Sequence, residues 1–234
     1  MHMGRSLSVG VVAASLFVLP AAAQDFDLGQ VAHDRGDYAT AVANWQPLAE
    51  AGHANAQAKL GTLYEHGHGV SLDVGKAVYW YRKAARQGIP KAQFHLGSMY
   101  FQGKGVPQDQ EKGVKWWRKA ADNCVPVAQS NLGAMYEKGD VVARDIRQAG
   151  AWYRKAAANG DGGAMFNLGR IYAMGEDLEV DLVESLMWLS LAMAIDGSDG
   201  IELVYRYVAG QMTHEQRDEA LERAIKWAED HGYG

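Results

Sequence analysis

The sequence predicts an all-α protein, a solenoid built from antiparallel helix pairs. Three observations support this fold class. The dipeptide Leu-Gly recurs every 36 residues, and Tyr, Trp, Gly and Asp recur at the same interval. Between these positions, apolar residues are spaced three and four apart, as on one face of a helix. Single hairpins of this kind cannot bury their apolar faces alone, so neighbouring units must stack into a continuous core.

The amino-acid composition excludes several other classes of protein. The 234-residue chain is 48% apolar and contains 7 Trp, 11 Tyr and 5 Phe, which is incompatible with a mostly disordered chain. Its single cysteine excludes a scaffold held by disulfides within the chain. The formal net charge of −5 argues against nucleic acid or an anionic membrane as the main partner.

Residues 1–23 have the pattern of a signal peptide. Arg5 forms a short basic region, residues 7–19 are apolar or small, and an Ala-x-Ala cleavage site precedes Gln24. We therefore expect cleavage between Ala23 and Gln24, and a periplasmic or secreted protein. The alternative is an uncleaved membrane anchor, although the apolar run is shorter than the ~20 residues that span a bilayer. After cleavage we expect no stable membrane insertion.

Residues 24–52 predict a shorter opening hairpin. Leu28 precedes Asp37 by 9 residues, whereas Leu60 precedes Asp73 by 13. The loop between the two helices is therefore expected to be shorter than in the units that follow.

Residues 53–197 predict four full units, and the first illustrates them all. A helix over 54–66 carries Leu60 and Gly61, and the missing side chain of Gly61 lets a neighbouring helix approach closely. A glycine-containing loop ends this helix. Asp73 is then placed to cap the second helix through its carboxylate. The fourth unit has a more apolar second helix, which indicates that the following segment covers it.

Residues 198–234 predict a terminal helical cap. Thr213 and Gln216 have capping-box spacing and open an amphipathic helix. A polar outer face of this kind keeps the end of a solenoid soluble.

The unit in residues 56–85 reads Ala-x-x-x-Leu-Gly-x-x-Tyr, then Gly-x-Gly-Val, then Asp-x-x-Lys-Ala-x-x-Trp-Tyr-Arg-Lys-Ala-Ala. This pattern resembles the Sel-1-like repeat family, whose members are related to tetratricopeptide repeats. Residues 24–52 resemble a tetratricopeptide-like hairpin. The resemblance implies a right-handed α-solenoid. It also implies a non-enzymatic exported protein, with no cofactor or metal, that binds a protein or peptide as an adaptor or regulator in the cell envelope.

The resemblance further implies a concave groove, lined by positions two before, two after and five after each repeated Leu. Phenylalanines there offer apolar contacts, whereas Asn and Arg side chains can hold the oxygens of an extended ligand. The predicted partner-binding residues are Phe94, His95, Phe101, Asn131, Phe166, Asn167 and Arg170. The alternative is that the three phenylalanines pack between repeats.

Two other functions stay open. An envelope hydrolase acting on peptidoglycan or β-lactams would need a nucleophile or metal with a base in reach, but no such motif is present. His66 and His68 form a close pair without a visible third metal ligand. A carbohydrate-binding module would need Trp80, Trp116 and Trp152 exposed. Cys124 occupies a turn, where we expect a small tolerated residue, with Asn123 available for any left-handed position; the alternative is a thiol that pairs with another chain.

Overall fold

The computed structural model describes residues 25–175, 177 and 179–233, so the expected signal peptide lies outside the described residues. Within these ranges the chain forms twelve α-helices and no strand, which confirms the predicted fold class. The helices are α1 (Phe26–Asp34), α2 (Tyr38–Glu50), α3 (Ala54–His66), α4 (Val74–Arg86), α5 (Pro90–Gln102), α6 (Gln110–Asp122), α7 (Pro126–Lys138), α8 (Ile146–Ala158), α9 (Gly162–Met174), α10 (Leu182–Ile195), α11 (Asp199–Ala209) and α12 (His214–Asp230).

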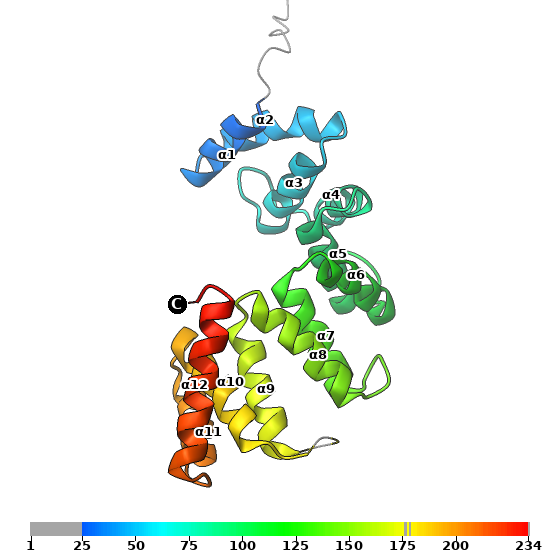
Figure 1. Ribbon diagram of the computed structural model, residues 1–234. Coiled ribbons are helices and arrows are strands. Elements are labelled where there is room, and N and C mark those ends of the chain that lie inside the picture. Colours follow the sequence, from blue (N-terminus) through cyan, green and yellow to red (C-terminus); the bar gives the residue numbers. More distant parts are fainter. Residues whose placement is uncertain (1–24, 176, 178, 234) are drawn as a thin grey trace, which may run out of the picture.

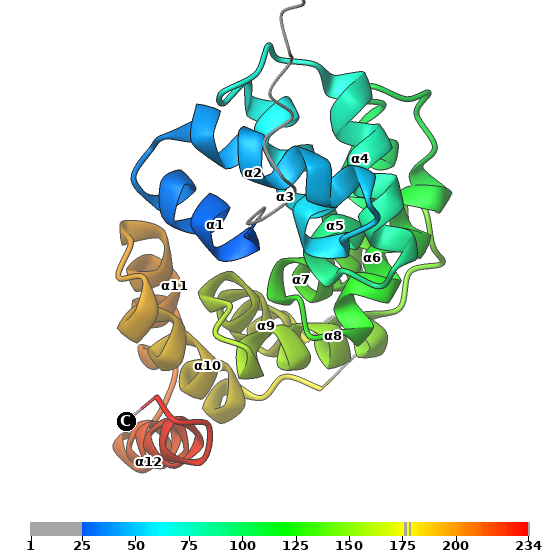
Figure 2. The ribbon, with the colours of Figure 1, turned by 90° about the horizontal axis from the view of Figure 1, so that it is seen from above.

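Consecutive helices pack in antiparallel pairs that wind into a right-handed superhelix. The chain descends from α1 to α11 in Figure 1, where α12 runs back upward, and seen from above it runs clockwise from α1 to α11 (Figure 2). Helices α3, α5, α7 and α9 lie toward the centre of this ring, and α4, α6 and α8 lie outside them. The first helix of each pair therefore supplies the concave surface.

The predicted helix boundaries are set by the repeated aspartates and glycines. The carboxylates of Asp37, Asp73, Asp109, Asp145 and Asp181 each accept the backbone N–H three residues onward, the first four at 2.9–3.1 Å. These bonds satisfy donors that the first helical turn leaves free. Helices α3, α5, α7 and α9 each end at a left-handed glycine, where a side chain would be strained.

The repeated Leu-Gly glycine is the point of closest approach between the two helices of a pair. A Cβ on Gly61 would lie 2.6 Å from the Tyr81 ring, and one on Gly97 would lie 2.6 Å from Trp117. Gly133 and Gly169 face Tyr153 and Leu189 in the same way. In the opening hairpin, Gly29 faces Trp45. The glycine and the ring it faces are fewer residues apart in this hairpin than in the full units, because the loop between its helices is shorter, as the sequence predicted.

Buried glutamines join each of the first three full units to the one before it; the fourth carries Met165 at this position. Gln57, Gln93 and Gln129 donate from Nε2 to the carbonyls of Ala49, Ala85 and Ala121 at the ends of the preceding helices. These bonds satisfy terminal carbonyls inside the core.

The C-terminal cap covers the most apolar helix, α10, as predicted. Leu186 and Leu189 of α10 are fully buried against α11 and α12, and Trp227 meets Trp188 edge to face at 5.2 Å. The capping box at Thr213 is present. However, α11 and α12 each pack on α10 rather than on each other. The described residues therefore form five hairpins closed by two separate capping helices.

The prediction that Asn123 adopts any left-handed conformation in the turn after α6 is wrong. Cys124 itself has the left-handed conformation, with φ 58°, whereas Asn123 has φ −98°. The equivalent positions hold Gly88 and Gly160, with φ 90° and 87°. The turn geometry is thus conserved among the repeats, and the cysteine is forced to adopt it. None of the described helices is both long and apolar enough to cross a bilayer.

Candidate functional site

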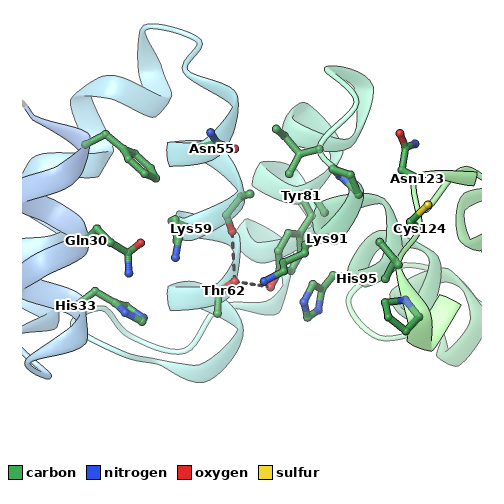
Figure 3. A pocket seen from close by; sticks show the side chains of 17 residues that line it. Gln30, His33, Asn55, Lys59, Thr62, Tyr81, Lys91, His95, Asn123 and Cys124 are labelled. Carbon is green, nitrogen blue, oxygen red and sulfur yellow. Dashed lines mark hydrogen bonds between the residues drawn. The ribbon is translucent and has the colours of Figure 1, made fainter. Parts of the chain in front are cut away.

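A hollow of about 710 Å³ opens on the concave side of the N-terminal half of the solenoid. Helices α1, α3 and α5 and the turn before α7 form its walls, and their side chains converge on it in Figure 3. The apolar lining includes Phe26, Ala58, Ile89, Pro90, Val125 and Pro126. The polar lining comprises Gln30, His33, Asn55, Lys59, Thr62, Tyr81, Lys91, His95 and Asn123, with the thiol of Cys124 at one edge.

The repeat register brings some of these side chains together. Ala58, Lys59 and Thr62 stand two before, one before and two after Leu60, and His95 stands just before Leu96. Gln30 and His33 stand two and five after Leu28 of the opening hairpin. The rule for inward-facing positions therefore accounts for only part of this hollow, because Lys59, His95, Lys91 and the turn before α7 lie outside the rule. Of the seven predicted partner-binding residues, only His95 lines it.

The hollow has a positive character. Lys59 and Lys91 line it together with three amide side chains, whereas no carboxylate is among its lining residues. Lys59 is partly buried, and its Nζ lies 5.4 Å from the centre of the Trp45 ring. Burial lowers the pKa of Lys59; Asp34 nearby opposes this, and the charge of Lys91 adds to it. An oxyanion that contacts both ammonium groups would offset the burial of the Lys59 charge and its repulsion by Lys91.

Glu65 lies at the C-terminal end of α3 and connects two repeats. Its carboxylate accepts hydrogen bonds from the Tyr81 hydroxyl at 2.8 Å and from Lys104 Nζ at 3.1 Å, and His95 Nδ1 lies 3.6 Å away. Burial raises the pKa of this carboxyl, but the two hydrogen bonds and the charges of His95 and Lys104 outweigh it, so the pKa lies below its usual value. The pKa of His95 is also lowered, chiefly by burial.

The same arrangement recurs two repeats later, which identifies its role. Glu137 accepts a hydrogen bond from the Tyr153 hydroxyl at 2.8 Å and pairs with Arg170 from the next repeat. In both places a carboxylate joins a tyrosine of its own repeat to a cation of the following one. The recurrence favours bracing between repeats over acid–base chemistry. Arg170, predicted to contact a ligand, is held in this brace.

The predicted phenylalanines are partly buried packing residues. Phe94 and Phe101 place their rings 6.5 and 4.7 Å from Trp117, and Phe166 packs against the C-terminal clusters. This matches the alternative in which they fill gaps between helices. Asn131 and Asn167 are half-buried on α7 and α9, one and two repeats beyond His95. They continue the concave surface but do not line the hollow.

The histidines considered for metal binding and the tryptophans considered for sugar binding make packing contacts instead. His68 stacks on Tyr38 at 4.5 Å and on His66 at 5.5 Å. Among the described residues, no three His, Cys, Asp or Glu side chains are grouped closely enough to hold a metal ion. Trp80 and Trp152 are buried, so they cannot stack on a sugar, and Trp116 is half-buried.

Comparisons with known proteins identify the repeat. Structures similar to this chain include a Sel1 repeat protein from Oxalobacter formigenes, which is 28% identical with a TM-score of 0.74 over 86% of this chain and 84% of that one. A protective antigen of uropathogenic Escherichia coli with an SLR fold is 32% identical, also with a TM-score of 0.74. The match covers 87% of this chain but only 45% of that antigen. A search of curated proteins gave no significant match.

The family comparison follows the periodicity of the chain. The Sel1 repeat model matches residues 54–89, 90–123, 126–161 and 163–193, which together make up more than half of the sequence. Sel1 repeat proteins generally mediate protein–protein interactions, and their fold is typically a non-catalytic scaffold. The chain belongs to the Sel1 repeat family.

Proposed function

We propose that this protein is an exported, non-enzymatic adaptor or regulator that captures an extended segment of a partner protein in its concave hollow. The observation that carries the proposal is the hollow itself. It combines an apolar floor with amide, lysine and histidine side chains presented by three consecutive inner helices. Such a mixture suits a peptide, because amides can pair with its backbone while apolar walls hold its side chains.

The charges of the hollow favour a segment with at least one carboxylate. Lys59 and Lys91 are both available from the lining, and the neighbouring acid Glu65 is already bonded to Tyr81 and Lys104. A carboxylate of the partner would gain charge-assisted hydrogen bonds from the two lysines.

Selection from a random peptide library on the protein tests this proposal. We expect the selected peptides to be rich in Asp and Glu and to lose roughly tenfold or more in affinity when Lys59→Glu and Lys91→Glu are combined. The control is Lys115→Glu with Lys119→Glu, an equal charge change on exposed residues of α6 outside the hollow. Equal loss in both variants, or unchanged binding to the first, would overturn the proposal.

The export part of the proposal is supported by the sequence pattern of residues 1–23. Intact-mass measurement of the protein recovered from the producing cells tests it separately. We expect a chain that begins at Gln24 and is found outside the cytoplasm. An uncleaved chain in the cytoplasmic fraction would contradict export without affecting the peptide-binding proposal.

A further inference from the structure

A second pocket, of about 320 Å³, lies between α4, α5 and α6. Its lining consists of Arg82, Arg86, Leu96, Tyr100, Lys112 and Trp116, none of which lines the concave hollow. Three of these six side chains are cationic and none is acidic. We call it the basic pocket.

Two of the cations contact the buried side chain of Tyr100. Arg82 Nη2 donates to the Tyr100 hydroxyl at 3.1 Å, and Lys112 Nζ lies 4.3 Å from the centre of the same ring. Arg86 follows Arg82 by one helical turn on α4, and like charges at this spacing repel each other. Within the part of the chain that the structure describes, none of the three cations forms an ion pair.

The other repeats provide an internal comparison, because they keep the same framework of Leu, Tyr and Trp. The three charged positions are Gln46, Glu50 and Lys76 in the preceding copy, Arg118, Asp122 and Gln148 in the next, and Arg154, Ala158 and Glu184 in the last. Each of these sets has no net formal charge, whereas the basic pocket carries three positive charges. The contact of Arg82 with Tyr100 recurs as Arg118 with Tyr136 and Arg154 with Tyr172, so this arginine belongs to the repeat framework. What the other repeats show is that stacking does not require three cations at these positions at once.

The tryptophan of the basic pocket is also the most accessible of its kind. Trp80, Trp152 and Trp188 are buried at the equivalent position, whereas Trp116 is only half-buried. The framework is thus open in the one copy where positive charge is concentrated. An uncompensated cluster around an open cavity is what an anion site requires.

We propose that the basic pocket binds a phosphate group. A phosphate monoester carries close to two negative charges near neutral pH and offers three acceptor oxygens. A phosphate can therefore pair with both guanidinium groups and the ammonium group at once. A single carboxylate has only two oxygens and one charge, so it neutralises the three cations less completely. The phosphate can belong to a small soluble compound or to a lipid headgroup, because both present the same chemistry to the pocket.

Calorimetric titration of the protein with inorganic phosphate, and sedimentation with phosphatidylcholine vesicles containing phosphatidic acid, test the proposal and separate the two sources. The variant combines Arg86→Asp with Lys112→Gln, the residues that the next repeat carries at these positions. The control is Lys115→Gln, an exposed lysine of α6 outside the basic pocket. Circular dichroism verifies that both variants keep the helical content of the unmodified protein.

We expect binding of at least one probe, weakened roughly tenfold or more by the double variant and less than about twofold by the control. Specific binding of inorganic phosphate supports a soluble ligand, and specific binding of the vesicles alone supports a headgroup. Failure of both probes to bind would overturn the proposal, as would equal losses in the variant and the control.

Discussion

The first and second Sel1 repeats fill the same gap between their helices with different chemistry. In the first, Gly61 faces the ring of Tyr81, whose buried hydroxyl donates to Glu65. In the second, Gly97 faces Trp117, whose ring lies against Phe101 and whose indole N–H donates to Ser98 at 3.2 Å. The third repeat follows the first, with Tyr153 and Glu137.

This difference shows that the ring and its neighbour form a unit. A buried phenol needs an acceptor, so tyrosine is accompanied by a carboxylate, whereas the larger apolar indole is accompanied by phenylalanine. The carboxylate then attracts a cation from the next repeat, which is Lys104 in one case and Arg170 in the other. Alternation of the pair thus decides which junctions between repeats are braced by charge.

Substitution of the glycine beneath the ring should have the largest effect. In Gly97→Leu, the first added atom would lie 2.6 Å from Trp117 and 2.9 Å from the Gly113 carbonyl oxygen, so the helices must separate. We expect a loss of more than about 3 kcal/mol in the free energy of unfolding, measured by urea denaturation. Gly75→Leu, at an exposed position with no close neighbour besides Asp73, is the control and should change little. A Gly97→Leu protein that unfolds like the unmodified chain would contradict this packing.

Exchange of the pair should have an intermediate effect. Glu65→Phe alone removes the charged acceptor of Tyr81 and Lys104, leaving Thr62 Oγ1 at 3.1 Å from the Tyr81 hydroxyl, and should cost about 2 kcal/mol. Adding Tyr81→Trp recreates the pair of the second repeat, and Thr62 stands where Ser98 accepts the indole N–H. A double-mutant cycle should therefore show a favourable coupling of about 1 kcal/mol. Strictly additive losses would show that the ring and its neighbour act independently.

The pH dependence of stability should give the smallest effect. The pKa of His95 is lowered in the fold by burial, so its contribution is fully present above about pH 6.5 and is lost as the pH falls through its folded value. Glu65 also has a lowered pKa, and its contribution is lost only at lower pH, below about 4.5. His95→Asn, the residue of the next two repeats at this position, should flatten the upper part of the melting-temperature profile and leave the acid part. A profile unchanged by this substitution would contradict the lowered pKa of His95.

The sequence predicted the helices well because their causes are local. Aspartate caps, left-handed glycines and the Leu-Gly contact are each set by a few neighbouring residues, and the repeat displays them several times. The pairing of Glu65 with Tyr81 was not predicted, although the two positions change together among the repeats and this signal could have indicated it. Aromatic character, however, directed attention to Phe94, Phe101 and Phe166, whose rings serve packing.

The concave hollow could not be located from the repeat alone. Its walls come from α1, α3, α5 and the turn before α7, which are brought together by the curvature of the superhelix. The repeat rule gives the same inward positions in every unit, so it cannot indicate where they enclose a cavity. The left-handed conformation of Cys124 has a local cause instead, since Gly88 and Gly160 adopt it at the equivalent positions of other repeats.

Cys124 makes the central claim directly measurable. It is the single cysteine of the chain, it is exposed, and it lines the hollow. The rate at which iodoacetamide alkylates it should fall roughly tenfold when an acidic peptide selected on the protein is added at saturation, because a bound segment covers the thiol. Lys59→Glu combined with Lys91→Glu should abolish this protection. An alkylation rate that stays the same at saturating peptide would place the binding site elsewhere and contradict the assignment of the hollow.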